Sequence, residues 1–229
     1  MMVAGKSIFE YRAVVWDLDG TLYYQRKMRL IMLKEMIKHA LCHPLRIKEL
    51  FAVKKFREIR EKWDTLPDRE MTGDAGDTDL AKAQYRYVAG LLHMESSAVR
   101  EAVEAWMYER PLAFIASCRD EEAARLMESL RERGIANYIF SDYPIEDKLK
   151  ALSLSAEGYY AATDARIGVL KPDPKSLFLI MSEHGLKAED LFVIGDRDSR
   201  DGEAARRAGC TFLILAKSRR ERERQYRNI

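Results

Sequence analysis

Two aspartates, Asp17 and Asp19, stand one residue apart where the apolar run of VVWDLDGTLYY ends. At a separation of ~5 Å and an effective dielectric constant of ~20, two such carboxylates repel each other by about 3 kcal/mol. Alternate residues of an extended segment lie on the same side, so both side chains can face one site. A pair of this kind indicates either a site that binds a cation or two side chains that point into water.

Three further segments place polar or charged residues after predicted strands or between them. Ser141-Asp142 follows the strand YIF, and GDRDSRD begins at Gly195 after the strand FVI. Between them, the segment VLKPDP presents Lys171 in a rigid loop. Each segment by itself has a plain interpretation as a turn, a helix N-cap or a solvated charge. Together they are more specific, because ligands bind at the carboxyl ends of the strands in a parallel sheet.

The predicted site combines four acidic residues, Asp17, Asp19, Asp196 and Asp201. Several carboxylates that converge without a cation would be strongly destabilising. A hard divalent ion with oxygen ligands removes this difficulty, and magnesium, Mg²⁺, suits a site that also accepts a phosphate. The groups expected to supply positive charge and hydrogen-bond donors to that phosphate are Thr21, Ser141 and Lys171.

The elements that position these residues alternate between strands and helices after Pro111. The predicted strands cover 12–16, 136–141, 158–163, 191–195 and 211–215. The predicted helices of this part cover 119–133, 144–153, 174–184 and 200–208. Such alternation indicates an α/β fold, a doubly wound parallel sheet with helices on both faces.

Residues 25–110 are predicted to be an all-helical insertion, so that 1–24 and 111–229 form one core domain and 25–110 a lid or cap. Apolar residues recur every three or four positions in 30–41 and in 50–59, which indicates two amphipathic helices separated by Pro44. Two further helices are predicted over 79–93 and 96–110, after an acidic loop at 64–79. The side chains expected to pack inside this insertion are Met28, Met32, Met36, Trp63 and Trp106.

Charge is distributed unevenly along the insertion. Residues 26–62 contain twelve Lys and Arg against four Asp and Glu, whereas 63–110 contain ten acids against five bases. The plain interpretation is a solvated outer face. The alternatives are a basic helix that lies on a membrane or contacts an acidic partner, and a basic face that attracts an anionic substrate. The C-terminal segment KSRRERERQYRN is expected to be a frayed helix or a disordered end.

Composition limits the remaining classes of function. A net charge of +2 on 229 residues argues against a general nucleic-acid binder. The cysteines Cys42, Cys118 and Cys210 lack the spacing of a disulfide framework or a zinc site and fit a reducing compartment. No run approaches the ~18 apolar residues of a membrane helix, and the first residues lack a secretory apolar segment. We therefore expect a cytoplasmic protein without a transmembrane segment.

In their order along the chain, these motifs resemble those of the haloacid dehalogenase (HAD) superfamily. The first motif, D-x-D-G-T-[LV], is matched by residues 17–22, and the second by Ser141. The third is matched by Lys171-Pro172, and the fourth by Gly195-Asp196 with Asp201. The helical insertion between the first two motifs resembles the C1-type cap of this superfamily, which closes over the site and selects the substrate.

The resemblance implies a Rossmann-like HAD core and a Mg²⁺-dependent phosphatase that acts on a small phosphate monoester. Asp17 would be the nucleophile that forms an aspartyl-phosphate, and Asp19 the general acid and then the general base. The implied metal ligands are Asp17, the backbone carbonyl of Asp19, Asp196 and Asp201. The implied phosphate-binding positions are Gly20, Thr21, Ser141, Asp142 and Lys171, although the Asp142 carboxylate itself is expected to point away.

The sequence leaves some alternatives open. Asp198 competes with Asp201 for the second acid of the fourth motif; the spacing favours Asp201, and Asp198 would cap the next helix or pair with Arg197 or Arg200. Asp19 favours transfer of phosphate from oxygen, because relatives that cleave carbon–halogen or carbon–phosphorus bonds generally lack an acid there. A sugar phosphomutase and a non-catalytic interaction protein that uses the basic cap are the alternative functions.

Overall fold

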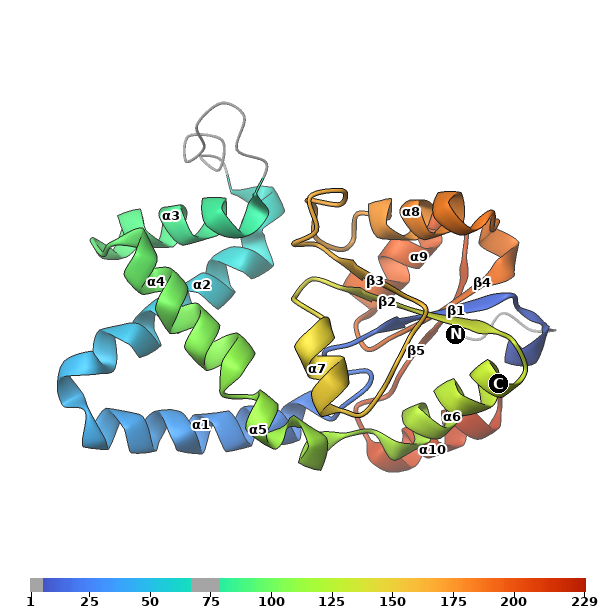
Figure 1. The fold of residues 1–229 in the computed structure, drawn as a ribbon, viewed down its shortest axis with the longest axis horizontal. Coiled ribbons are helices and arrows are strands. Elements are labelled where there is room, and N and C mark those ends of the chain that lie inside the picture. Colours follow the sequence, from blue (N-terminus) through green and yellow to red (C-terminus); the bar gives the residue numbers. More distant parts are fainter. Residues whose placement is uncertain (1–5, 67–78) are drawn as a thin grey trace. The chain divides into compact units, whose positions relative to one another are not determined.

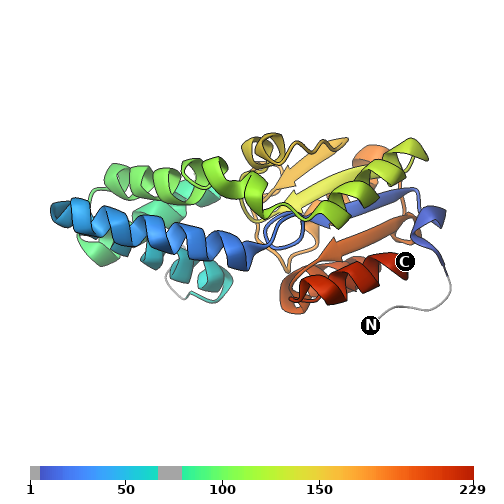
Figure 2. The same cartoon turned by 90° about the horizontal axis from the view of Figure 1, so that it is seen from below.

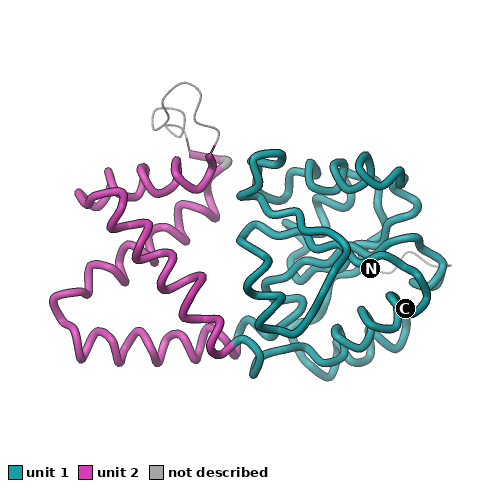
Figure 3. Tube along the Cα trace, in the orientation of Figure 1, with its two compact units in different colours: residues 1–26, 115–229 teal, residues 27–114 magenta. Residues whose placement is uncertain are grey.

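The computed structural model describes residues 6–66 and 79–229. The chain divides into two compact units (Figure 3). Unit 1 comprises Met1–Arg26 and Ile115–Ile229, and unit 2 comprises Lys27–Phe114. Most of the loop predicted at 64–79 lies outside the described residues.

A five-stranded parallel sheet in the order β3-β2-β1-β4-β5 forms the centre of unit 1 (Figures 1 and 2). Its strands are β1 (Ala13–Asp17), β2 (Ala136–Ser141), β3 (Gly158–Ala161), β4 (Leu191–Gly195) and β5 (Thr211–Ile214). The chain crosses from one side of β1 to the other between β3 and β4, so the switch in strand order lies beside the ends of β1 and β4. All five residues of β1 are buried, as expected for a strand covered on both faces.

Helices cover both faces of this sheet, which confirms the predicted fold class. Figure 1 shows α6 and α10 on one face and α8 and α9 on the other. The helices of unit 1 are α6 (Glu121–Glu132), α7 (Glu146–Ala151), α8 (Lys175–His184), α9 (Glu203–Ala208) and α10 (Arg219–Arg227). A short helix, α5 (Leu112–Ile115), ends where the second part of unit 1 begins. Among the described residues, none of the helices has the length and apolar content needed to cross a bilayer.

The C-terminal segment forms the terminal helix α10, one of the two expected outcomes, but a buried side chain anchors this helix to the rest of unit 1. The Arg222 side chain of α10 is buried and donates to Asp120 Oδ2 at 3.1 Å. The same guanidinium donates to the carbonyl oxygens of Gly20 at 2.5 Å and of Thr21 at 3.4 Å. Gly20 and Thr21 lie about two hundred residues away in the sequence and Asp120 about one hundred, so the charge pattern of the segment alone could not indicate them.

The secondary structure in the described residues of unit 2 is all helical. Its helices are α1 (Gln25–Cys42), α2 (Ile47–Lys62), α3 (Leu80–Leu92) and α4 (Ser96–Val103), and α4 continues as a π-helical segment, Glu104–Glu109. Phe56 of α2 is fully buried and stacks on Tyr85 of α3, with ring centroids 5.2 Å apart. Trp63 and Trp106 are buried as predicted.

Helix α1 has two apolar faces. Met28 and Met32 are buried as predicted, together with His39, whereas Met36 is only half-buried. At 100° per residue, the apolar residues that recur from 30 to 41 lie on a different side of the helix from these buried residues. These side chains are exposed, with exposed fractions of 62% for Leu30, 52% for Leu33, 52% for Ile37 and 79% for Leu41. The spacing therefore indicated a helix but not which side of it is buried.

Candidate active site

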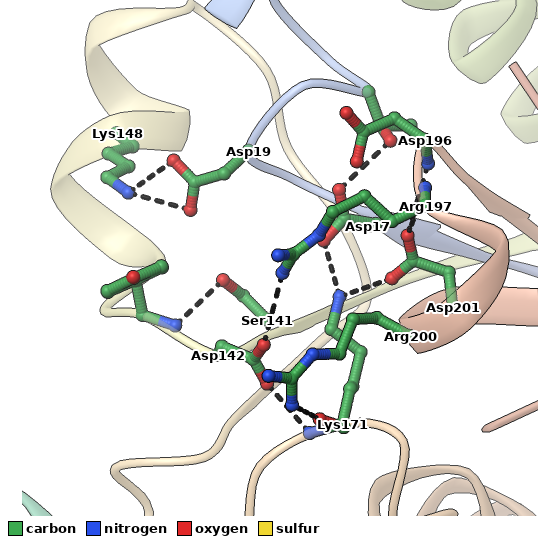
Figure 4. Close-up of polar contacts among 12 residues, drawn as sticks. Asp17, Asp19, Ser141, Asp142, Lys148, Lys171, Asp196, Arg197, Arg200 and Asp201 are labelled. Carbon is green, nitrogen blue, oxygen red and sulfur yellow. Dashed lines mark hydrogen bonds and ion pairs between the residues drawn. The ribbon is translucent and has the colours of Figure 1, made fainter. Parts of the chain in front are cut away.

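Polar residues from three strand ends meet at one edge of the sheet in unit 1 (Figure 4). Asp17 is the last residue of β1, and Ser141 is the last residue of β2. The register that pairs Trp16 with Ile194 places the end of β1 beside the end of β4, where Asp196 follows. Parallel pairing of the central strands thus brings Asp17 together with residues that are more than a hundred positions away in the sequence.

Three carboxylates form a cluster at this edge. One oxygen from each of Asp17, Asp196 and Asp201 lies within 4.8 Å of the others. Asp17 and Asp201 are buried, and Asp196 is half-buried. Asp201 also accepts hydrogen bonds from the backbone N–H groups of Asp196, at 3.1 Å, and Arg197, at 2.9 Å. The bonds to Asp201 fix the turn that carries Asp196.

A buried lysine lies against this cluster. Lys171 Nζ is 2.5 Å from Asp17 Oδ1 and 2.6 Å from Asp201 Oδ1. Burial alone would lower the pKa of Lys171, but the carboxylates of Asp17 and Asp201 outweigh it and raise that pKa. The loop around the lysine is held by Arg200, which donates to the Lys171 carbonyl. The ammonium group is therefore charged and fixed in position.

The cluster carries more negative charge than one lysine offsets. Burial raises the pKa of Asp17 to about 8, and the carboxylates of Asp201 and Asp196 add to this rise, while Lys171 opposes it. Burial and Asp201 also raise the pKa of Asp196. Clustered carboxylate oxygens are the ligands of hard divalent cations such as Mg²⁺, and a cation there would favour the ionised form of all three groups. The donor set therefore fits a divalent metal ion.

The Asp19 carboxylate points away from the cluster, toward helix α7 (Figure 4). Lys148 Nζ donates to its two oxygens at 2.6 Å and 2.9 Å, and the Tyr23 hydroxyl donates to Oδ1. Burial would raise the pKa of Asp19, but Lys148 and Tyr23 lower it overall. Asp17 and Asp19 therefore have opposite environments although they are one residue apart.

Sequence reasoning missed Lys148, yet the pattern of α7 contains a signal for it. Lys148 stands three residues after Ile145, next to Leu149 and four residues before Leu152, and all three apolar side chains are buried. The lysine thus occupies the apolar side of a short helix, where a charge needs a partner. That partner is Asp19, which the sequence alone could not identify.

The predicted phosphate-binding residues lie around Asp17. Thr21 Oγ1 donates to Asp17 Oδ2 at 3.0 Å, and Ser141 Oγ accepts from the Tyr143 N–H at 3.0 Å. Gly20 has a φ of +106°, and a Cβ there would lie 2.3 Å from Asp196 Oδ2, so a side chain is excluded. Asp142 Oδ1 accepts from the backbone N–H of Lys171 at 2.9 Å, which helps to hold the lysine loop.

The two candidates for the second acid of the fourth motif differ in position. Asp201 belongs to the carboxylate cluster, whereas the side chain of Asp198 is exposed and forms an ion pair with Arg206 at 2.9 Å. Arg206 is a partner that the sequence analysis did not consider. The geometry brings Asp201, and not Asp198, to the cluster.

Comparisons with known proteins agree with this fold. A family model described as haloacid dehalogenase-like hydrolase matches residues 11–209. A 2-haloacid dehalogenase from Pseudomonas syringae pv. Tomato DC3000 has a similar structure, with a TM-score of 0.60, 18% sequence identity and coverage of 90% of this chain and 86% of that one. None of the curated proteins matches the sequence.

Structures described as phosphatases are similar to nearly the same degree. A predicted phosphoglycolate phosphatase from Haemophilus somnus 129PT gives a TM-score of 0.56 at 16% identity, covering 93% of this chain and 88% of that one. A HAD phosphatase from Thermococcus onnurineus gives 0.53 at 18% identity, covering 90% and 86%. At these identities the structures show the fold alone, whereas the family model spans most of the sequence. The chain therefore belongs to the family of haloacid dehalogenase-like hydrolases.

Proposed function

We propose that the protein is a Mg²⁺-dependent phosphatase that hydrolyses a small phosphate monoester through an aspartyl-phosphate on Asp17. The observation that carries this proposal is the contact between Asp17 and Lys171 at 2.5 Å, beside a carboxylate cluster suited to a divalent cation. We assign the metal ion to Asp17, Asp196, Asp201 and the backbone carbonyl of Asp19. When bound, it would offset the charge of the phosphate and of the carboxylates.

Charge and proton requirements favour a phosphate ester over an organic halide. A phosphate monoester brings about two negative charges to a carboxylate nucleophile, so its site needs cations. Its leaving alkoxide needs a proton, and Asp19 stands two residues after Asp17 to supply one. A halide leaves as a stable anion and needs neither a clustered cation site nor a proton donor. The carboxylate cluster supports the first requirement, and Asp19 would meet the second once it is protonated.

The reaction proceeds in two displacements. In the first, a carboxylate oxygen of Asp17 bonds to phosphorus, the ester P–O bond breaks, and Asp19 gives its proton to the leaving alcohol. In the second, Asp19 removes a proton from water, the water oxygen bonds to phosphorus, and the P–O bond to Asp17 breaks. Alcohol and inorganic phosphate are released, and both aspartates return to their starting states. Lys171 and Ser141 hold phosphate oxygens throughout.

Lys148 affects the first displacement, because it favours the ionised form of Asp19 and so opposes proton uptake. An incoming phosphate dianion has the opposite effect, since a nearby negative charge raises the pKa of a carboxyl group. Substrate binding would therefore favour the protonated Asp19 that the first step needs. We assign to unit 2 the role of a cap that selects the substrate. We take that substrate to be a small phosphorylated metabolite of the cytoplasm.

The test is hydrolysis of 4-nitrophenyl phosphate with Mg²⁺ or with a chelator, compared between the wild type and Asp17→Asn. We expect Mg²⁺-dependent phosphate release by the wild type and a loss of about a thousandfold or more in the variant. Asp198→Asn, which changes an exposed acid of the fourth motif, is the matched control and should remain active.

Two results would contradict the proposal. One is full activity of Asp17→Asn. The other is release of halide from 2-chloropropionate by a wild-type protein that releases no phosphate from any ester tested, which would assign the chain to the dehalogenases. If the protein proves to be an active phosphatase, a panel of phosphorylated metabolites would identify its substrate.

A further inference from the structure

Most of the large apolar side chains that are exposed lie on two helices of unit 2 and the turn between them. Ten large hydrophobic residues are exposed among the described residues, and seven of them fall between positions 30 and 51. Scattered exposed hydrophobic residues are normal, but a contiguous patch marks a surface that contacts something. We call this surface the α1–α2 apolar face; its main residues are Leu30, Leu33, Ile37, Leu41, Leu45 and Phe51.

The face is continuous across both helices. Leu33 and Ile37 of α1 and Leu50 and Phe51 of α2 line a groove of about 540 Å³ between the two helices. Leu30 and Leu41 lie on the same side of α1 as Leu33 and Ile37, because these four positions recur every three or four residues. Since Met28, Met32 and His39 already pack α1 into unit 2, packing within the unit does not need this second face.

The surroundings of the face are basic. Residues 26–62 contain twelve Lys and Arg against four Asp and Glu. The exposed bases of these helices and their connection include Arg29, Lys34, Lys38, Arg46, Lys48 and Lys54. A second copy of the chain that docked through the same face would bring the same positive charges against each other, which costs free energy. Charge complementarity therefore requires an anionic partner.

We propose that the α1–α2 apolar face binds the surface of an anionic lipid bilayer. A basic amphipathic helix with leucines on one side lies in the membrane interface, and each basic residue near an anionic surface adds to the attraction. An acidic helix bound in the groove would leave Leu30, Leu41 and Leu45 uncovered, because these residues do not line it. Leu45, in the turn that connects α1 with α2, is 96% exposed, and a bilayer would cover all three.

The experiment is co-sedimentation of the whole protein with phosphatidylcholine vesicles that do or do not contain phosphatidylglycerol. We expect binding to the anionic vesicles that weakens as salt is added. The double variant Leu41→Ser/Leu45→Ser should lower the partition coefficient by about tenfold or more. Leu91→Ser is the matched control, because Leu91 is 47% exposed on α3 of the same unit and lies outside the face.

The proposal is independent of the proposed function, since hydrolysis of a soluble aryl phosphate without vesicles should be the same in all these proteins. It would be overturned if the wild type bound anionic and neutral vesicles equally weakly, or if the double variant bound as tightly as Leu91→Ser. Gel filtration with light scattering provides a further test. A wild-type dimer that the double variant converts to a monomer would assign the face to a second copy instead.

Discussion

Asp17 and Asp19 show that the fold can give two chemically identical residues very different environments. Asp17 is buried beside two other carboxylates, which raises its pKa to about 8. Asp19 is half-buried and is paired with Lys148 and Tyr23, and its pKa is lowered. Pairs of carboxyl groups with contrasting environments divide roles between them in hydrolytic enzymes. The contrast fits a nucleophile that needs a cation and a separate group for proton transfer.

Lys148 allows this division to be tested. Replacing it with methionine removes the charge that orients Asp19 and leaves a half-buried carboxylate with Tyr23 as its donor. Removing Lys148 would make Asp19 easier to protonate, but we expect the lost orientation of its carboxylate to outweigh this gain. The value of kcat/KM for an alkyl phosphate should therefore fall by about tenfold to a hundredfold. An aryl phosphate should lose less, since its leaving group needs less protonation.

Two further variants make this test specific. Lys148→Arg keeps a positive charge and should recover part of the activity. Lys150→Met, which changes an exposed lysine of the same helix, should behave as the wild type. Steady-state kinetics on both substrates provide the measurement. Equal activity in Lys148→Met and Lys150→Met would show that the ion pair has no part in catalysis.

The site could be predicted from the sequence only in part, for a physical reason. Asp17, Asp196 and Asp201 follow or stand near strand ends, and parallel strands bring their ends together, so their convergence follows from the fold class. Lys148 lies inside a helix, and its partner depends on how α7 packs within unit 1. The same holds for Arg206, which pairs with Asp198.

At the scale of elements, α10 supports the loop that follows β1. Arg222 donates to the carbonyls of Gly20 and Thr21 and pairs with the buried Asp120. We expect Arg222→Met to lower the free energy of unfolding by about 3 kcal/mol, because removing one member of a buried ion pair leaves the other charge unpaired. Hydrolysis should slow as well, since the loop carrying Thr21 loses its support.

Urea denaturation measures this effect, and Arg224→Met is the control. Arg224 is exposed on the same helix, and its replacement should change the stability by less than about 0.5 kcal/mol. If the two variants had equal stability, α10 would not support the active-site loop.

The order of strands and helices could be predicted wherever the spacing of apolar residues determines it. The central strands are short apolar runs bounded by glycine or polar residues, and they occur at the predicted positions. Two features depended on contacts that spacing does not encode. The apolar residues of α1 at 30–41 proved to be exposed, and the charged segment at 219–227 proved to be an anchored helix.

At the scale of the whole molecule, the proposed metal ligands all belong to unit 1. A ligand that binds only the folded state stabilises it, by about 2.7 kcal/mol at a concentration a hundredfold above its Kd. Mg²⁺ should therefore raise the melting temperature of the wild type and of Asp198→Asn but not that of Asp196→Asn. With a chelator present, Asp196→Asn should be no less stable than the wild type, because the substitution removes carboxylate repulsion. Thermal denaturation provides the measurement, and a shift that persisted in Asp196→Asn would place the metal ion elsewhere.

Unit 2 should respond to pH through His39. Burial lowers the pKa of His39 below its ordinary value of 6.5, although Glu49, 3.6 Å away, partly opposes this. The folded state therefore disfavours the charged imidazole. The stability that follows from this preference is complete above pH 6.5 and is lost as the pH falls through the lower pKa of the folded state.

The ring of Trp106 reports this titration directly, because its centroid is 5.0 Å from that of His39 and a protonated imidazole quenches indole fluorescence. Tryptophan fluorescence should fall with acidification, with a midpoint below pH 6.5. His39→Gln should abolish this fall and reduce the loss of thermal stability between neutral and acidic pH. His43→Gln, which changes the exposed neighbouring histidine, should retain both effects. A midpoint at or above 6.5, or one that survives in His39→Gln, would mean that another group governs the acid response of this unit.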